Sequence, residues 1–329
     1  MAGPFHNAIR GVTLVVPGTG SFQPSGAAPG ALPWPSAIAW AGLVRFEDGT
    51  DWELRYCFWN GLTISRPAAG FVASSTGSGL NLSANATAEL VADGYRVRPD
   101  TPGVYRELIP VPGSNAPQAL GMPAATGIGT ATAPALASTN YLTGQNRVQY
   151  ASATTANSQA GVVNTQAMAI IDTSSGRGGW KFACRYGAST LPTGPRLFVG
   201  MTAGTFASNT GEPSAFVQNY AVHGRDSTDT FIQLITNSNA GGGTKISTGI
   251  SFAANGWYES VIWCDPGNFT IKALLIRWDT GEIHYTETST DTPNNASLLF
   301  PQMIGSLNGT NTGTAITMQF GGYSVRSGG

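Results

Sequence analysis

Pairs of carboxylates are the side chains in this chain that could do acid–base chemistry. Hydrolysis of a glycosidic bond needs two carboxylates flanking that bond, roughly 5–10 Å apart. The closest candidate groups are Asp226 with Asp229, and Glu282 with Glu287. The second pair would point to opposite faces of an uninterrupted strand, and the first lies in a polar turn, where we expect the acids to cap the turn. We therefore predict no catalytic residue and no enzyme, although a glycosidase site built between subunits stays open.

Histidine and cysteine could bind metals or act as nucleophiles, but their spacing favours neither role. The three histidines and three cysteines are widely separated: His6, His223 and His284, with Cys57, Cys184 and Cys264. Zinc sites in one chain usually show close Cys-x-x-Cys or His-x-x-x-His spacing. Each cysteine lies in an apolar run, so we expect buried free thiols. Phosphate-binding loops and nucleophile elbows are also missing from the sequence. We predict no metal and no cofactor.

Aromatic residues beside predicted turns could bind sugars. Trp278 precedes the Asp279-Thr280-Gly281 turn, Tyr285 lies on the strand that returns from it, and Trp257 follows the Ala-Asn-Gly turn at 254–256. A ring at a loop rim can stack on the C–H face of a sugar while neighbouring polar groups bind its hydroxyls. These three residues are our candidate glycan-binding residues. The alternative is that the rings close the ends of a hydrophobic core.

The composition indicates which elements must position these residues. Hydrophobic residues make up 41% of the 329 residues, which is enough for a core, but charged residues make up only 11%. Helical proteins usually carry many more Glu, Lys and Arg on their solvent faces, whereas 43 glycines and 20 prolines favour short strands joined by turns. We therefore predict an all-β protein.

Charge and hydropathy also bear on partners and location. The net charge is −1 with dispersed Lys and Arg, which argues against a nucleic-acid partner because phosphate binding needs clustered cations. An apolar run of about 18 residues is missing, and residues 1–20 lack the pattern of a signal peptide. We expect a chain that is assembled in the cytoplasm and does not insert into a membrane.

Three regions differ in pattern. In residues 1–98, the run from Trp52 to Trp59 alternates with period two after the Asp48-Gly49 turn, which predicts a hairpin in a small antiparallel β-barrel or sandwich. Residues 99–146 are rich in Pro, Gly and Ala and lack strand patterning. We expect an extended connector there, ordered by neighbouring subunits and open to proteases.

Residues 147–329 show strand patterns at nearly regular intervals, which predicts a jelly-roll-like β-sandwich of roughly ten strands. The predicted strands are Met168–Asp172, Trp180–Tyr186, Arg196–Thr202, Phe216–His223, Phe231–Thr236, Trp257–Cys264, Phe269–Trp278, Glu282–Thr288, Leu298–Ile304 and Ala315–Arg326. Both faces of Trp257–Cys264 are largely apolar, so we expect that strand to be central.

Two stretches of the chain resemble virion proteins of tailed bacteriophages. Glu47–Glu53 (EDGTDWE), Ile64–Arg66 (ISR) and Ser74–Ser83 (SSTGSGLNLS) resemble a small β module of phage tail and capsid-attached proteins, without the Gly that usually follows Trp-Glu. Ser152–Gly161 (SATTANSQAG), with Gly129–Ala133 before it and Gly179–Gly187 and Arg196–Gly200 after it, is similar to the C-terminal lectin-like sandwich of phage tail fibres.

This resemblance covers about two thirds of the chain and implies a function. It implies a homotrimeric fibre or spike of a phage or phage-like particle, located in the virion. The N-terminal domain would attach to other virion proteins of the tail, baseplate or capsid, and the sandwich would bind a host surface glycan. Two alternatives stay open: a head spike or capsid decoration fibre, and a tailspike depolymerase that cleaves capsular polysaccharide.

Overall fold

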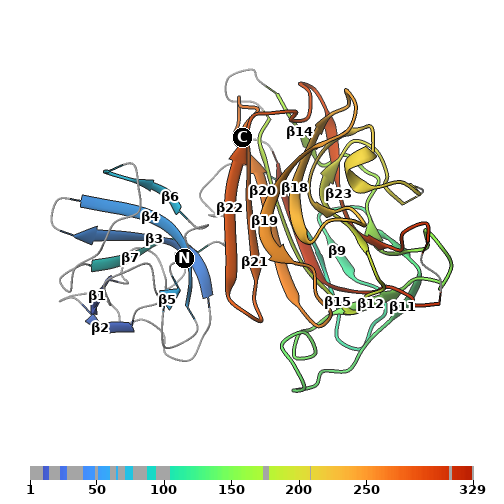
Figure 1. Ribbon diagram of the computed structural model, residues 1–329, viewed down its shortest axis with the longest axis horizontal. Helices are drawn as coiled ribbons and strands as arrows, with labels where there is room; N and C mark the ends of the chain where they lie inside the picture. Colours follow the sequence, from blue (N-terminus) through green and yellow to red (C-terminus); the bar gives the residue numbers. More distant parts are fainter. Residues whose placement is uncertain are drawn as a thin grey trace. The chain divides into compact units, whose positions relative to one another are not determined.

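The computed structural model describes residues 10–14, 23–27, 40–48, 51–59, 64–65, 71–76, 87–93, 104–172, 178–207, 209–310 and 313–327. The chain divides into two compact units: Met1–Arg98 with the short segment Thr280–Tyr285, and Pro99–Asp279 with Thr286–Gly329. Strands dominate both units, and the prediction of an all-β protein is confirmed (Figure 1). Of the residues described, none belongs to a helix that is long and apolar enough to cross a membrane.

The N-terminal unit is built on one antiparallel sheet. Among the described residues its strands follow the order β2-β1-β7-β3-β4-β5, and β6 also pairs with β4. Their bounds are β1 (Arg10–Leu14), β2 (Gln23–Ala27), β3 (Trp40–Asp48), β4 (Asp51–Trp59), β5 (Ile64–Ser65), β6 (Phe71–Ser74) and β7 (Thr87–Asp93). The predicted hairpin is confirmed, because β3 pairs with β4 from Trp40↔Trp59 to Asp48↔Asp51. Gly49 lies outside the described residues.

One face of the β3–β4 hairpin buries an ion pair among apolar residues. Arg55 Nε lies 2.8 Å from Glu53 Oε1, and both side chains are almost fully buried. The strand register places them beside Val44 and Phe46, with Cys57 next along the strand. Two charges can be buried together because each neutralises the other and satisfies its hydrogen bonds.

The C-terminal unit is a sandwich of two antiparallel sheets, as predicted (Figure 1). Among the described residues, the first sheet has the order β10-β13-β23-β16-β17-β18-β19, with β14 also paired to β23. Its strands are β10 (Thr126–Ile128), β13 (Gln159–Val163), β14 (Ala169–Ile170), β16 (Arg196–Thr202), β17 (Asn219–Arg225), β18 (Phe231–Ser238), β19 (Thr244–Ser251) and β23 (Leu298–Ser306).

The second sheet has the order β11-β12-β24-β15-β20-β21-β22 in the described part of the chain, and β8 and β9 extend it beside β24. Its strands are β8 (Val104–Ile109), β9 (Gln118–Leu120), β11 (Thr130–Thr132), β12 (Val148–Ala151), β15 (Trp180–Thr190), β20 (Trp257–Cys264), β21 (Ile271–Arg277), β22 (Glu282–Thr288) and β24 (Thr317–Ser327). β20 lies inside this sheet, between β15 and β21, so the prediction of a central strand is confirmed.

The main core lies between the two sheets and takes alternate residues of each strand. Val199 and Met201 of β16 face Phe182 of β15 and Ile262 of β20 within one cluster of buried apolar side chains. All three cysteines are buried and free, so the expectation of buried thiols is confirmed. This alternation of inward and outward residues is what allows two twisted sheets to share a dry interior.

Residues 104–146 correct the prediction of a connector. β8 pairs with β24, β10 with β13, and β11 with β12, so this segment supplies edge strands to both sheets of the sandwich. The small residues that hid these strands from pattern analysis still provide backbone hydrogen bonds, which is all that a short edge strand needs. The partner strands belong to the same chain, so a neighbouring subunit is not needed to order the described part of this segment.

A second cluster lies on the outer face of the first sheet, under residues 203–218, which connect β16 to β17. Phe206 of this connection stacks on Phe198 of β16, with ring centroids 4.5 Å apart and planes at 4°. Phe216 packs edge-on against Phe198 and lies over Tyr220 of β17. Adjacent antiparallel strands can be joined by two residues, so a connection of this length is an addition that the aromatic contacts hold down. It also carries the short 3₁₀ helix η2 (Pro213–Ala215).

Candidate functional site: the loop end of the C-terminal sandwich

Trp257 is not exposed at a loop rim, which corrects the prediction that it is a glycan-binding residue. It opens β20 and is only 2% exposed. Its ring lies against the glycines of neighbouring strands, because a Cβ at Gly321 would collide with the indole and one at Gly187 would come within 3.2 Å of it. The ring is part of the packing of the second sheet and offers no free face to a sugar.

Trp278 is also buried, at 9% exposure, and its polar edge is used internally. Its indole Nε1 donates a hydrogen bond to Glu259 Oε2 at 3.0 Å, and its backbone N–H donates to Trp257 O at 2.8 Å. The structure therefore brings the two tryptophans together as packing residues. Tyr285 lies half-buried in the middle of β22. The alternative that aromatic rings close the ends of the core describes the two tryptophans better than sugar binding does.

Glu259 is a buried acid whose charge depends on pH. Burial raises its pKa to about 7, against the opposing effects of Arg185 and of the Trp278 hydrogen bond. The Arg185 Nε atom lies 3.5 Å from Glu259 Oε2. Since the folded pKa lies above the ordinary value of 4.5, the folded state keeps a proton that the unfolded state releases between about pH 4.5 and 7.

Stability should therefore fall as the pH rises through that window, by about 3 kcal/mol from this residue alone. Glu259→Gln keeps an acceptor for Trp278 and removes the titration. The test is to measure the free energy of unfolding in urea between pH 4.5 and 8 for the wild type and for Glu259→Gln, which is the matched control. We expect the wild-type value to fall relative to that of the variant as the pH rises. Parallel curves for the two proteins would show that Glu259 stays ionised throughout.

Asp226 and Asp229 cap a turn, as the sequence predicted, and both also bind the side chain of Lys245. Lys245 Nζ lies 3.0 Å from Asp226 Oδ2 and 2.6 Å from Asp229 Oδ1. Asp226 also accepts hydrogen bonds from the Ser214 backbone and hydroxyl, and Asp229 accepts one from the Asp226 backbone. Burial opposes the Lys245 charge, but the hydrogen bonds to Asp229 and Asp226 keep its pKa above the ordinary value. Both carboxylates are thus committed to structure.

Five loops meet where β13, β16 and β18 begin and β17 and β23 end; we call this the loop end of the sandwich. The loops are residues 152–158, 191–195, 203–218, 226–230 and 307–316, of which the structure describes all but 208, 311 and 312. Sandwich folds commonly place their binding residues in loops that a rigid double sheet supports. Sequence analysis did not identify this site, because its residues are far apart along the chain.

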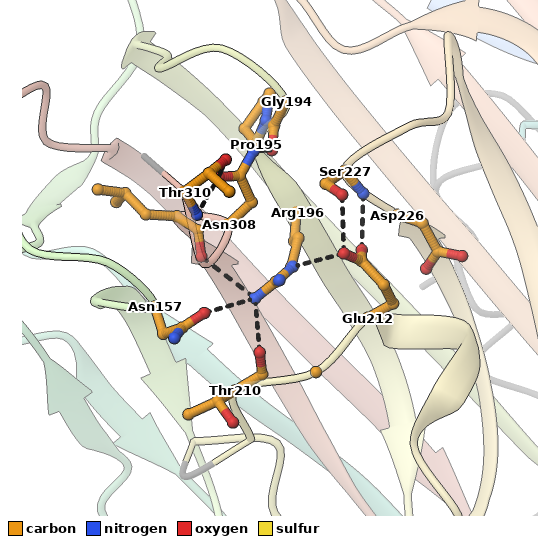
Figure 2. Close-up of polar contacts among 12 residues, drawn as sticks. Asn157, Gly194, Pro195, Arg196, Thr210, Glu212, Asp226, Ser227, Asn308 and Thr310 are labelled. Carbon is orange, nitrogen blue, oxygen red and sulfur yellow. Dashed lines mark hydrogen bonds and ion pairs between the residues drawn. The ribbon is translucent and has the colours of Figure 1, made fainter. Parts of the chain in front are cut away.

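Arg196, the first residue of β16, ties four of these loops together (Figure 2). Its Nη1 donates to Asn157 Oδ1 at 3.0 Å, to Thr210 O at 2.9 Å and to Leu307 O at 3.3 Å. Its Nε lies 3.2 Å from Glu212 Oε1, and Glu212 in turn accepts hydrogen bonds from the Ser227 backbone and hydroxyl, both at 2.7 Å. A guanidinium suits this role because it offers several donors in a fixed plane.

Asn308 fixes the remaining loop contacts. Its Nδ2 donates to Thr193 O at 3.3 Å and to Gly194 O at 3.2 Å, and its Oδ1 accepts from the Thr310 backbone at 3.0 Å (Figure 2). Gly194 has a φ of +57°, which glycine adopts without strain. The loop end is therefore held by hydrogen bonds within the chain itself, and loops fixed in this way would lose little conformational entropy if they bound a ligand.

Phe231 supplies an accessible ring at this end. It is 38% exposed and directly follows the turn of residues 226–230. Its neighbours Ile232 and Leu234 point into the core between the sheets, so Phe231 lies on the outer face. Sequence analysis treated it only as the start of a strand. The apolar residues Ile232 and Leu234 alternate with Phe231 along the strand, and this alternation could have indicated that Phe231 lies on the opposite face from the core.

The described residues of the loop end include no evident acid–base pair. Its carboxylates are occupied by Arg196, Lys245 and backbone N–H groups, as described above. Among the residues that the structure describes, no group of three or more His, Cys, Asp or Glu could hold a metal ion. Glu282 and Glu287, the other pair considered, lie on the uninterrupted strand β22 and so on opposite faces of it.

Comparison with known proteins adds distant similarities in fold. No family model and no curated protein matches the chain. Among solved structures, the Lotus tetragonolobus seed lectin is 10% identical over 60% of this chain and 92% of that lectin, with a TM-score of 0.41. Peanut lectin is 13% identical over 69% and 98%, with a TM-score of 0.43. A protein of unknown function from Shewanella oneidensis MR-1 is 11% identical over 69% and 87%, with a TM-score of 0.43.

Proposed function

We propose that this chain is an adhesive fibre or spike subunit of a tailed-phage virion, and that its C-terminal sandwich binds a host surface glycan without cleaving it. The observation that carries the binding half of the proposal is the loop end itself. There an exposed aromatic ring, Phe231, lies beside loops whose polar side chains are already fixed by hydrogen bonds. Such a combination stacks on a sugar ring and pairs with its hydroxyls.

The virion half of the proposal rests on the resemblance of the N-terminal and C-terminal motifs to phage proteins. In this role the chain is a homotrimer, its N-terminal unit attaches to other virion proteins, and it is assembled in the bacterial cytoplasm. A reconstruction of whole particles tests this half. Density for the chain on the tail would support a fibre, density on the head would favour a capsid spike, and a particle without the chain would contradict both.

The absence of cleavage is supported by how the acids at the loop end are used. Asp226 and Asp229 hold Lys245, and Glu212 holds Arg196 and Ser227. A general acid must be free to release its proton to the leaving group. Release of reducing ends from purified host polysaccharide would convert the assignment to a depolymerase.

Phe231→Ala should weaken glycan binding about tenfold, since losing the contact of one aromatic ring costs about 1.5 kcal/mol. A single site is expected to bind in the millimolar range, and several copies per particle raise the avidity. Binding of the intact chain to host cells and to purified surface polysaccharide measures the effect.

The matched control is Leu298→Ala. Leu298 is an apolar residue that is 58% exposed, and it begins β23, at the opposite end of the same sheet from the loop end. Both variants should keep the wild-type circular dichroism spectrum. Equal binding by wild type and Phe231→Ala would remove the loop end as the glycan site.

A further inference from the structure

We infer that the glycan bound at the loop end is uncharged, because the cations at this end are balanced one for one by carboxylates of the chain itself, and Arg196 and Lys245 contact those carboxylates directly. This inference rests on the proposed function and adds the chemical class of the ligand. It depends on the charges that the loops carry and on how those charges are paired.

The charges at the loop end sum to zero. The five loops, taken with the flanking strand residues Arg196 and Arg225, contain two basic and three acidic residues and no histidine, and Lys245 of β19 adds one more cation. The three cations are Arg196, Arg225 and Lys245, and the three acids are Glu212, Asp226 and Asp229. Arg225 interacts electrostatically with all three acids, so the six groups form one neutral system.

Each cation has internal partners. Arg196 has the Glu212 carboxylate and three oxygen acceptors, and it is almost fully buried while the Glu212 side chain is about one third exposed. The solvent side of this pair is therefore a carboxylate. Arg225 Nη1 donates to Pro195 O. A ligand anion could reach the Arg196 guanidinium only by displacing one of these acceptors, and the displaced buried group would be left without a partner. Arg225 keeps its charge, but Glu212, Asp226 and Asp229 all act on it electrostatically and would also repel a ligand anion beside it.

Lys245 is the most exposed of the three cations, but it does not favour an anion. It is bonded to both Asp226 and Asp229, so this group of three carries a net charge of −1 in total. A uronate or phosphate group brought to the ammonium would meet two carboxylates at the same place. Like charges at close range are unfavourable, and a partly buried site screens them less than water does.

A sugar hydroxyl fits the same groups without displacing any of them. It can donate to the partly exposed Glu212 carboxylate and accept from Lys245. The rest of the rim is neutral and polar, with exposed threonines at positions 154, 155, 193, 210 and 310. Phe231 adds an apolar face. An uncharged, hydroxyl-rich ligand therefore matches the donors, acceptors and apolar surface of the loop end.

The test is a glycan array that pairs neutral oligosaccharides with counterparts bearing a uronate or phosphate, probed with the intact chain. We expect the neutral member of each pair to bind at least about tenfold more tightly than the charged one. Because an uncharged ligand is little affected by screening, we expect its affinity to change less than about twofold between roughly 50 and 500 mM NaCl. Asp229→Asn changes the net charge of the group formed by Lys245, Asp226 and Asp229 from −1 to 0, and should reduce the preference for neutral over charged oligosaccharides severalfold. Phe231→Ala should weaken binding to both members.

The outcomes separate the inference from the proposed function. If charged members bind as tightly as neutral ones and this binding depends on Phe231, the ligand class is wrong while glycan binding at the loop end stands. If wild type binds no member of the array, or if Phe231→Ala binds as wild type does, glycan binding at the loop end falls and the inference falls with it.

Discussion

Replacing Arg196 by alanine is expected to lower the free energy of unfolding of the sandwich by about 3–5 kcal/mol, because each buried acceptor that loses its donor costs about 1–3 kcal/mol. The side chain is almost fully buried beside Glu212 and donates to three oxygens on separate loops. Without it, the carbonyls of Thr210 and Leu307 and the Asn157 amide lose their donor, and the loops lose their common attachment.

Thermal unfolding measures this effect. A sandwich of this size should lose roughly 6–20 °C in melting temperature for that loss of free energy. Lys272→Ala is the matched control, because the Lys272–Asp265 pair, at 2.7 Å, is shorter than the Arg196–Glu212 pair but lies at the surface, where ion pairs contribute about 1 kcal/mol or less. Equal melting temperatures for the two variants would contradict the role of Arg196 as the residue that holds the loop end.

Replacing Trp257 by alanine is expected to cost about 3–5 kcal/mol of stability, as large core aromatics usually do. The ring is 2% exposed and fills the space above Gly321 and Gly187, so its removal leaves a cavity that backbone strands cannot close. The same change should leave glycan binding unaltered in the fraction of protein that stays folded.

Tyr141→Ala is the control for this variant, since Tyr141 is an aromatic that is partly exposed, and its loss should cost far less. Urea unfolding followed by circular dichroism compares the two. A Trp257→Ala protein with wild-type stability and lost binding would restore the original prediction that Trp257 is a sugar-binding residue.

Three strands were predicted from the sequence with the bounds that the structure shows. The predicted bounds of Arg196–Thr202, Trp257–Cys264 and Glu282–Thr288 coincide with those of β16, β20 and β22. β16 and β20 are buried along almost their whole length, and a short, largely apolar run is typical of a strand that is buried on both faces. β19 was missed because Thr, Ser and Gly weaken its apolar pattern, and β8 was missed because its pairing with β24 joins residues more than 200 positions apart.

The site was predicted only where local chemistry determines it. Capping by Asp226 and Asp229 follows from turn residues a few positions apart, and the structure places them so. The partners Arg196, Glu212, Asn157 and Leu307 span about 150 positions, and only the order of the strands brings them together. The rim aromatics were misplaced because aromatic residues beside turns occur in buried and exposed positions alike.

Hydrogen exchange of the intact chain, with and without purified host surface polysaccharide, tests glycan binding at the loop end most directly. We predict slower exchange of backbone amides in residues 153–158, 193–194, 209–212, 227–231 and 308–310 when the polysaccharide is present, and unchanged exchange around Trp257 and Trp278. Slower exchange confined to the region of those two tryptophans would contradict glycan binding at the loop end. So would unchanged exchange throughout the chain at a saturating concentration of polysaccharide.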